Sequence, residues 1–156
     1  MAVGQGIFWH VDGDQYEGQW QNDKANGIGK YKHADGALYV GAWLDDKQHG
    51  KGRESWVDGS TFEGEYRDGQ KWGYGCYLWA DGSSYKGDWH ENKIEGLGLY
   101  KWPDGREYHG AWKDNNMHGK GVYKWKDGRQ YDGEFVNDKK SGHGIYSYPD
   151  GRQYDG

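Results

Sequence analysis

An aromatic residue recurs every 23 residues along this chain, and this constant step constrains the fold more than any other feature. The recurring positions are Tyr16, Tyr39, Phe62, Tyr85, Tyr108, Tyr131 and Tyr154. A glycine follows each of them by two residues, and an Asp-Gly pair keeps the same step. A constant period without insertions predicts one small structural unit that is stacked on copies of itself.

The segment 85–107 shows what one unit should look like. Side chains alternate between the two faces of a strand, so Tyr85, Gly87 and Trp89 are expected on one face. A polar loop of six residues, 90–95, should follow, and then a second strand over 96–102. The Asp-Gly pair after that strand is a strong signal for a hairpin turn. Each unit is therefore predicted to be a β-hairpin.

We predict an all-β fold, an elongated, twisted, single-layer antiparallel β-meander of tandem 23-residue β-hairpins with fourteen strand segments. The body should be a rod or shallow trough with aromatic side chains on its concave face, where glycines leave room for the rings. We expect one continuous array over residues 1–156, with a partial unit at 4–15, full units at 16–38, 39–61, 62–84, 85–107, 108–130 and 131–153, and a partial unit at 154–156.

The composition agrees with such an array and limits the function. Ten Trp and 14 Tyr supply most of the apolar surface, which favours packing between neighbouring repeats over one central core. A formal net charge of −5 argues against a nucleic-acid partner. The single cysteine, Cys76, favours a reducing compartment. The sequence has neither a signal peptide nor a long apolar run, so we expect a cytoplasmic protein.

Charged residues form rows on the face opposite the aromatic one. First strands supply mostly acidic residues and second strands mostly basic ones, which predicts cross-strand pairs. The basic rows also leave open an alternative function, binding of a membrane surface through lipid headgroups. Its candidate contacts are Lys120, Lys124, Lys139 and Lys140. The interleaved acidic rows and the negative net charge argue against this alternative.

The pattern Y-x-G-x-W, six residues, G-x-G and then D-G resembles the MORN (membrane occupation and recognition nexus) repeat over essentially the whole chain. The resemblance implies a non-enzymatic scaffold within a cytoskeletal, ciliary or membrane-proximal assembly. Phosphoinositide binding, peptide binding in a groove and dimer formation all belong to the family picture. A location at the cytoskeleton or in the cilium follows from this analogy alone.

Signals of catalysis and metal binding are missing from the sequence. The seven histidines form no H-E-x-x-H motif and no Cys/His zinc set. No serine lies in a G-x-S-x-G elbow, and Cys76 has no identifiable base partner. We therefore predict that the protein is not an enzyme and that it uses no cofactor or metal.

A trough lined by Tyr and Trp predicts a protein partner, held as a helix or an extended segment. The candidate groove residues are Tyr39, Trp43, Glu54, Trp56, Trp79, Tyr85, Trp89, Trp102, Tyr108, Trp112 and Trp125. The chain also stops in mid-unit, at 154–156, which leaves a sheet edge exposed. Two alternatives stay open: the chain is a fragment of a longer protein, or another chain completes the edge in a larger assembly or by end-to-end self-association.

Two departures from the repeat mark individual sites. Glu54 stands where other units have an aromatic residue on the aromatic face. It should lie at the edge of the groove or receive a hydrogen bond, because burial of an unpaired carboxylate is costly. His10 and His33 stand in a slot that is Trp in the four units that follow.

Overall fold

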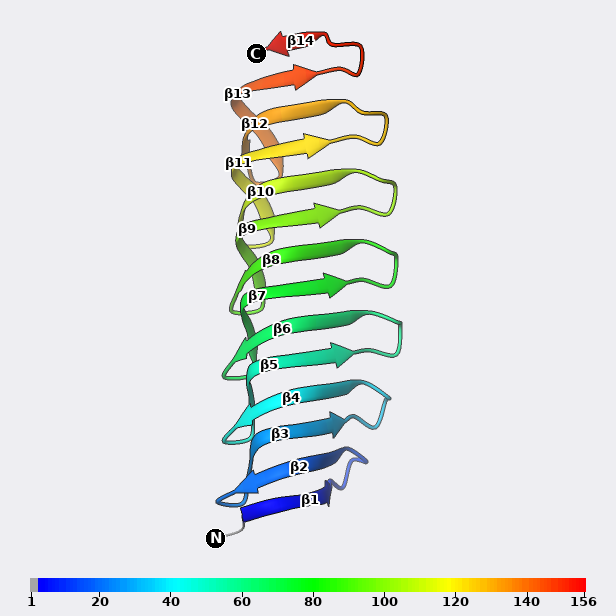
Figure 1. Cartoon of the computed structure of the whole chain (residues 1–156), viewed down its shortest axis with the longest axis vertical. Coiled ribbons are helices and arrows are strands. Elements are labelled where there is room, and N and C mark those ends of the chain that lie inside the picture. Colours follow the sequence, from blue (N-terminus) through cyan, green and yellow to red (C-terminus); the bar gives the residue numbers. More distant parts are fainter. Residues whose placement is uncertain (1–2) are drawn as a thin grey trace.

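The computed structural model describes residues 3–156 and forms one open sheet of fourteen strands, each hydrogen-bonded to its neighbours in chain order (Figure 1). All pairings are antiparallel, and the described residues contain no helix, so the predicted all-β meander is confirmed. The strands are β1 (Val3–Trp9), β2 (Gln15–Gln21), β3 (Lys24–Lys32), β4 (Leu38–Leu44), β5 (Lys47–Ser55), β6 (Thr61–Arg67), β7 (Gln70–Leu78), β8 (Ser84–His90), β9 (Lys93–Lys101), β10 (Glu107–Lys113), β11 (Asn116–Lys124), β12 (Gln130–Val136), β13 (Lys139–Ser147) and β14 (Gln153–Asp155).

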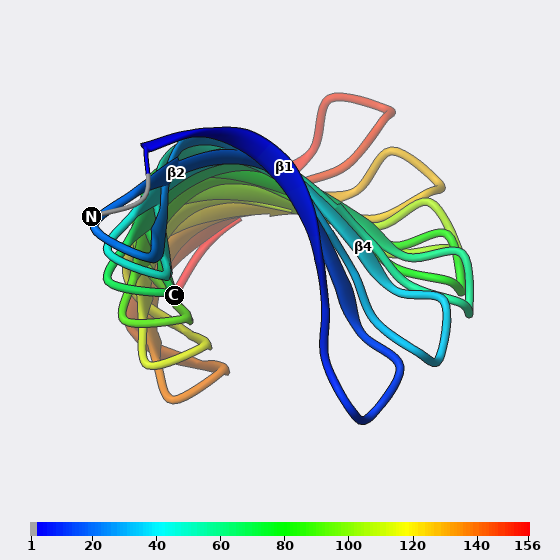
Figure 2. The same cartoon turned by 90° about the horizontal axis from the view of Figure 1, so that it is seen from below.

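The sheet is bent into a trough, which is seen when the molecule is viewed along its long axis (Figure 2). The pairing of β8 with β9 shifts register between Gly87 and Trp89, and Gly96 on the longer strand has a φ of 101°. A β-bulge of this kind bends a strand and increases its twist. The same shift recurs in every hairpin from β2–β3 to β12–β13, so the arch continues along the array.

The predicted six-residue loop is wrong. β8 continues to His90 and β9 begins at Lys93, so only Glu91 and Asn92 form the turn. Their φ angles are 49° and 68°, and two positive φ values identify a type I′ turn, whose backbone twist matches that of the strands. The residues assigned to a loop instead lengthen both strands, and the bulge accommodates the extra ones.

The Asp-Gly pair forms the other kind of connection, on the right-hand edge in Figure 1. Gly105 N–H donates to the Trp102 carbonyl at 3.1 Å, and Trp102 N–H donates to the Arg106 carbonyl at 2.9 Å. Gly105 has a φ of 96°. This is the three-residue hairpin loop in which a turn is followed by a left-handed residue, the position that favours glycine.

The anchor tyrosines lie flat across glycine pairs on the concave face. Gly87 and Gly98 are directly opposite each other, and the ring of Tyr85 covers both. A Cβ atom on Gly87 would lie 2.8 Å from the Tyr85 hydroxyl oxygen, and one on Gly98 would overlap the ring. The expectation that the glycines make room for rings is therefore confirmed.

The first-strand tryptophans join one repeat to the preceding one. Trp89 meets its own Tyr85 edge to face, with centroids 5.4 Å apart, and Phe62 of the preceding unit at 5.3 Å. Its indole Nε1–H donates to the Gly75 carbonyl at 3.1 Å. Edge-to-face pairs of this kind contribute about 0.5–1.5 kcal/mol each beyond area burial. The core therefore consists mainly of buried aromatic rings that pack against one another from each repeat to the next along the whole array.

Candidate functional site

Five of the predicted groove residues form the floor of the trough. Tyr39, Tyr85 and Tyr108 are at most 1% exposed, and Trp89 and Trp112 are each 6% exposed. The Trp112 indole repeats the bond of Trp89, donating to the Gly98 carbonyl at 3.2 Å. These side chains hold the groove in shape from beneath. Any role of theirs in direct partner contact stays a prediction.

The other predicted tryptophans are half-buried and lie nearer the surface. Trp43 donates its indole N–H to the Gly29 carbonyl at 3.1 Å. The remaining four alternate with second-strand tyrosines in a row along the concave face, here called the ring file. Neighbouring rings in the file have centroids 4.4 to 5.4 Å apart. The ring file consists of Trp56, Tyr77, Trp79, Tyr100, Trp102, Tyr123 and Trp125.

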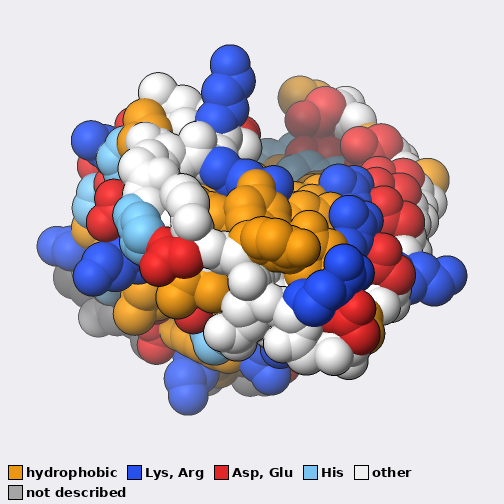
Figure 3. All heavy atoms as spheres, turned by 90° about the horizontal axis from the view of Figure 1, so that it is seen from above, with side chains coloured by type: hydrophobic (Ala, Val, Ile, Leu, Met, Phe, Trp, Pro, Cys, Tyr) orange, Lys and Arg blue, Asp and Glu red, His pale blue; other side chains and the backbone are white. Residues whose placement is uncertain are grey.

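The concave face is hollowed at three places along the array. An N-terminal hollow of about 380 Å³ lies over β1 to β4, and a middle hollow of about 430 Å³ lies beside Trp79. A C-terminal hollow of about 650 Å³ lies between Trp102 and Trp125, bounded by Arg106, Lys139 and Lys140. Viewed from the C-terminal end, hydrophobic side chains fill the trough and Lys and Arg side chains border it (Figure 3).

Glu54 receives a hydrogen bond, which is one of the two alternatives expected from the sequence. The Tyr66 hydroxyl donates to Glu54 Oε1 at 2.5 Å. Burial, and then the charge of Glu54, raise the pKa of Tyr66 far above its ordinary value, so this hydroxyl keeps its proton and remains a donor. The carboxylate is thereby held on the aromatic face without being left unpaired.

Lys71 faces the same part of the groove and was missed by the sequence reasoning. Its Nζ lies 5.2 Å from the ring centroid of Phe62 and 5.6 Å from that of Trp56, within cation–π range. Burial lowers the pKa of Lys71, and the charge of Glu54 opposes that shift. The repeat itself indicated that Lys71 lies on the concave face, because the same position in the next two units holds the buried Ile94 and Met117.

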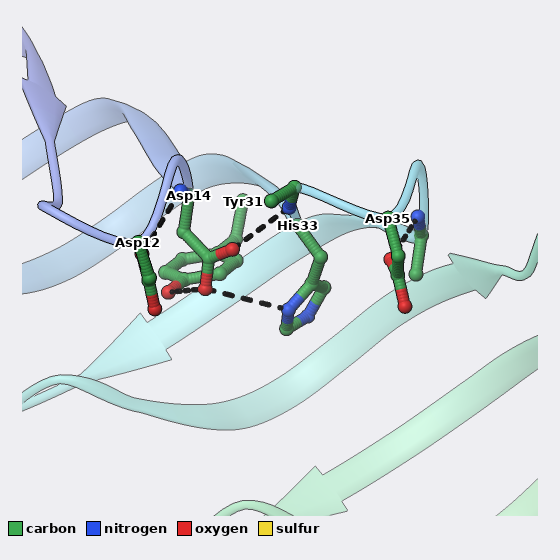
Figure 4. Close-up of polar contacts among 7 residues, drawn as sticks. Asp12, Asp14, Tyr31, His33 and Asp35 are labelled. Atoms are coloured by element: carbon green, nitrogen blue, oxygen red, sulfur yellow. Dashed lines mark hydrogen bonds and ion pairs between the residues drawn. The ribbon is translucent and has the colours of Figure 1, made fainter.

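At the N-terminal end of the array, the rim of the groove carries a carboxylate, that of Asp14 (Figure 4). Asp14 accepts hydrogen bonds from the Tyr31 hydroxyl at 2.7 Å and from Ala34 N–H at 2.8 Å. His33, which stands in the Trp slot, has its Nδ1 3.6 Å from Asp14 Oδ2. The bond from Tyr31, and then that from Ala34, hold the pKa of Asp14 below its ordinary value. Burial, and then the Asp14 bond, raise the pKa of Tyr31 to about 12.

At the C-terminal end the equivalent rim position is arginine in three consecutive units. Arg106, Arg129 and Arg152, here called the arginine ladder, each pair through Nε with the Asp of their own Asp-Gly turn, at 2.7, 2.8 and 2.6 Å. Their guanidinium carbons lie 5.2, 5.2 and 5.1 Å from the ring centroids of Trp102, Trp125 and Tyr148. The recurring D-G-R triplet was a signal for this ladder, and the sequence reasoning missed it.

The four lysines of the membrane alternative do not gather on one surface. Side chains alternate between the two faces of β11, and Tyr123 lies on the concave face. Lys120 and Lys124 are an odd number of residues from Tyr123, so they lie on the convex face. Lys140 lies on the concave face, with Nζ 4.8 Å from the ring centroids of Trp125 and Tyr146. Lys139 lines the C-terminal hollow.

The predicted charged rows are present on the convex face. Glu17 is directly opposite Lys30, Arg53 opposite Glu63, and Lys120 opposite Glu134. Lys101 and Glu107 come within 4.0 Å of each other. These exposed pairs support register and contribute little to stability.

Within residues 3–156, no three His, Cys, Asp or Glu side chains lie together in a way that could hold a metal ion. Over the same range, no helix is long and apolar enough to cross a membrane. Cys76 is a free, exposed thiol on the charged face.

The fold and the groove define this chain as an open β-hairpin repeat protein with an aromatic concave face. The MORN repeat model matches six segments, at residues 16–38, 39–61, 62–84, 85–105, 108–128 and 131–151. The chain therefore belongs to the MORN repeat family. A search of the curated proteins finds no match.

The matches among solved structures include one that shares the fold at low sequence identity, and a second with a lower TM-score. The TCP domain of SAS-4 (dCPAP) of Drosophila melanogaster, solved in complex with a proline-rich motif of Ana2 (dSTIL), has 10% identity and a TM-score of 0.60, over 98% of this chain and 83% of that one. The G-box domain of the microcephaly protein CPAP has 16% identity and a TM-score of 0.47, over 98% of both chains.

Proposed function

We propose that this protein is a non-enzymatic scaffold that binds a segment of a protein partner in its concave groove. The observation that carries the proposal is the ring file, seven half-buried or buried aromatic rings in unbroken succession along one face. Trp and Tyr are the residues most favoured at binding hot spots, because they bury large area at low cost in conformational entropy. Grooves lined by such residues commonly hold a helix or an extended segment.

The shape of the groove favours an extended occupant. The trough runs the length of the array, and its three hollows lie one after another along it. The SAS-4 domain, which shares this fold, was solved with a proline-rich motif bound to it. That likeness supports an open sheet of this shape as a platform for an extended segment.

The family resemblance extends the proposal to a place of action. We assign the scaffold to a cytoskeletal or ciliary assembly, in which one rigid array could present several partner segments in order. The division of Lys120, Lys124, Lys139 and Lys140 between two faces and an edge favours this protein-binding function over a membrane surface.

Panning of a displayed library of random peptides against the folded protein tests the proposal. We expect the enriched peptides to lose at least about tenfold in affinity for the double variant Trp79→Ala/Trp102→Ala, because both indoles belong to the ring file. These positions are preferred to Trp89 and Trp112, whose removal would leave cavities in the core.

The matched control is Trp9→Ala, which removes an indole that is 66% exposed on the opposite face. Affinity should be unchanged in this variant. Peptides that bind the Trp79→Ala/Trp102→Ala protein as well as the wild type would contradict the proposal. So would flotation with phosphoinositide vesicles in the absence of any groove-dependent peptide.

A further inference from the structure

We propose that the C-terminal half of the groove binds an acidic protein segment in the polyproline II conformation, with a carboxylate at every third residue facing the arginine ladder. The inference rests on the proposed function and adds to it the chemistry, the position and the register of the partner segment. Three features carry it: the charge at the two ends of the groove, the spacing of the arginines, and the state of their guanidinium groups.

Charge divides the groove into two halves. The C-terminal hollow is lined by Arg106, Lys139 and Lys140 and by one acidic side chain, Asp138, and a second carboxylate, that of Asp104, pairs with Arg106. Asp138 already accepts a hydrogen bond from Met117 N–H at 2.7 Å. An excess of positive charge beside apolar rings favours a segment that carries carboxylates.

The N-terminal hollow has the opposite character. It is lined by Asp23 and Asp46, with His10 beside them, and Asp14 occupies the nearby rim position. An acidic segment is therefore attracted to one half of the groove and repelled from the other. This polarity determines where along the array the segment binds.

The spacing of the ladder selects the conformation of the segment. Successive arginines are two strands apart, which corresponds to about 9.6 Å at about 4.8 Å per strand. A polyproline II helix has three residues per turn and rises about 9.3 Å in one turn. Its every third side chain thus points the same way and meets the next arginine.

Other conformations do not keep this register. In a β-strand, residues three apart point to opposite faces, although their separation of about 10 Å would match. In an α-helix, with a rise of about 1.5 Å, the same separation falls between six and seven residues, which is not a whole number of turns. The remaining two sides of a polyproline II helix can lie against the ring file, and aromatic grooves recognise such helices well.

The guanidinium groups of the arginine ladder keep N–H donors with which they can bind a second carboxylate. Each Asp partner engages Nε, and Arg106 uses Nη1 to donate to the Tyr123 hydroxyl at 2.9 Å. Further N–H donors remain on every guanidinium, which has five. The side chains of Arg106 and Arg129 are 39% and 46% exposed, so these donors are accessible, and the aromatic ring under each holds its plane in place.

Fluorescence anisotropy with two labelled synthetic peptides tests the proposal. The in-register probe is three repeats of Asp-Pro-Pro, and the rearranged probe has the same composition with its three Asp residues adjacent. We expect wild-type protein to prefer the in-register probe. The variant Arg106→Gln/Arg129→Gln should weaken that probe by up to about fivefold per arginine, since exposed ion pairs contribute about 0.2–1 kcal/mol each.

Two further variants make the result specific. Lys120→Gln/Lys124→Gln removes two positive charges from the convex face and should leave the affinity unchanged. Ser83→Arg extends the ladder by one unit, next to Trp79. It should strengthen a probe of four Asp-Pro-Pro repeats, while the probe of three repeats is unaffected. Urea unfolding of each variant confirms that the protein is folded.

Equal affinity for the in-register and rearranged probes would overturn the proposal, as would an equal loss in the convex-face control. The peptide library separates this failure from that of the proposed function. Groove-dependent peptides without carboxylates at every third residue would leave the scaffold function standing and remove this inference. If no peptide depends on the groove, both fail.

Discussion

At the scale of single residues, the repeat is stabilised by an aromatic ring that fills the space left by two glycines without side chains. Each anchor ring from Tyr16 to Tyr131 covers two glycines that face each other across its own hairpin, and the hydroxyl of Tyr85 then donates to the Asp88 carbonyl at 3.0 Å. The glycines cost conformational entropy, which the burial of the ring offsets. This packing accounts for part of the high glycine content of the chain, and turns and bulges with positive φ account for most of the rest.

Replacing Gly98 with alanine should lower the free energy of unfolding by about 1–3 kcal/mol, because the new Cβ would overlap the Tyr85 ring. Urea unfolding followed by tryptophan fluorescence measures the loss. In the double variant Tyr85→Ala/Gly98→Ala the clash is gone, so its stability should be no lower than that of Tyr85→Ala alone.

Gly6→Ala supplies the matched control for this prediction. Gly6 occupies the same slot in β1, but no anchor ring covers it, and its nearest contact to an added Cβ is Trp20 Nε1 at an ordinary 3.6 Å. This substitution should be close to neutral. An equal loss at Gly6 and Gly98 would show that the overlap with the ring is not the cause.

At the scale of the elements, the type I′ turns are tied to one another in a column along one edge. The Asn115 side chain accepts from Ile94 N–H at 2.8 Å, and Asn92 accepts from Lys71 N–H at 2.8 Å. Asp46 and Asp138 make the same bond to the preceding turn. At the equivalent position Gly69 has no side chain, so only the backbone bond from Gly69 N–H to the Gln48 carbonyl, at 2.9 Å, links that turn to the preceding one.

Asn115→Ala should destabilise the protein by about 1–3 kcal/mol, because Ile94 N–H loses its acceptor and alanine must adopt a φ of 69°. Asn115→Asp keeps the acceptor and matches Asp46 and Asp138, so it should stay within about 0.5 kcal/mol of the wild type. Thermal and urea unfolding distinguish the two. Comparable losses in both variants would rule out the turn column as a stabilising element.

At the scale of the whole molecule, the array is nearly one-dimensional. Each strand pairs only with its neighbours in the chain, and no connection crosses the sheet. The strands at the two ends each have one neighbour, and β14 contains only three residues. Stability in such arrays is a sum over units and the interfaces between them, so the middle is supported from both sides.

Hydrogen exchange should therefore be slowest in β6 to β9 and become progressively faster toward β1 and β14. Mass spectrometry of peptic fragments, or NMR of the backbone amides, measures this profile. Uniform protection across all strands would show that the array unfolds as one cooperative unit, and the one-dimensional description would then be wrong.

The amino-acid pattern alone was enough to predict the hairpin unit, the single open sheet, the alternation of aromatic and charged faces and the family. The first three of these features follow from two periods, of two and of 23 residues, and both are visible without knowledge of any distant contact; the family came from the resemblance of the repeat motif to the MORN repeat. The hydrogen bond to Glu54 was one of two expected alternatives, because a carboxylate on an aromatic face needs either a donor or a place at the groove edge.

Only the folded trough decided which aromatics lie in the core and which lie along the groove. Trp89 and Trp102 look equivalent as aromatic positions, but bulges bend the strands so that Trp89 is buried against Phe62 of the preceding unit while Trp102 lies on the surface of the groove. The recurring D-G-R triplet and the stacking of repeats were both visible in the sequence, but the structure was needed to show that each arginine of the ladder lies over an aromatic ring of the concave face. The length of the type I′ turn was missed because Asn and Asp in the left-handed region and an extra residue in a bulge read as loop in one dimension.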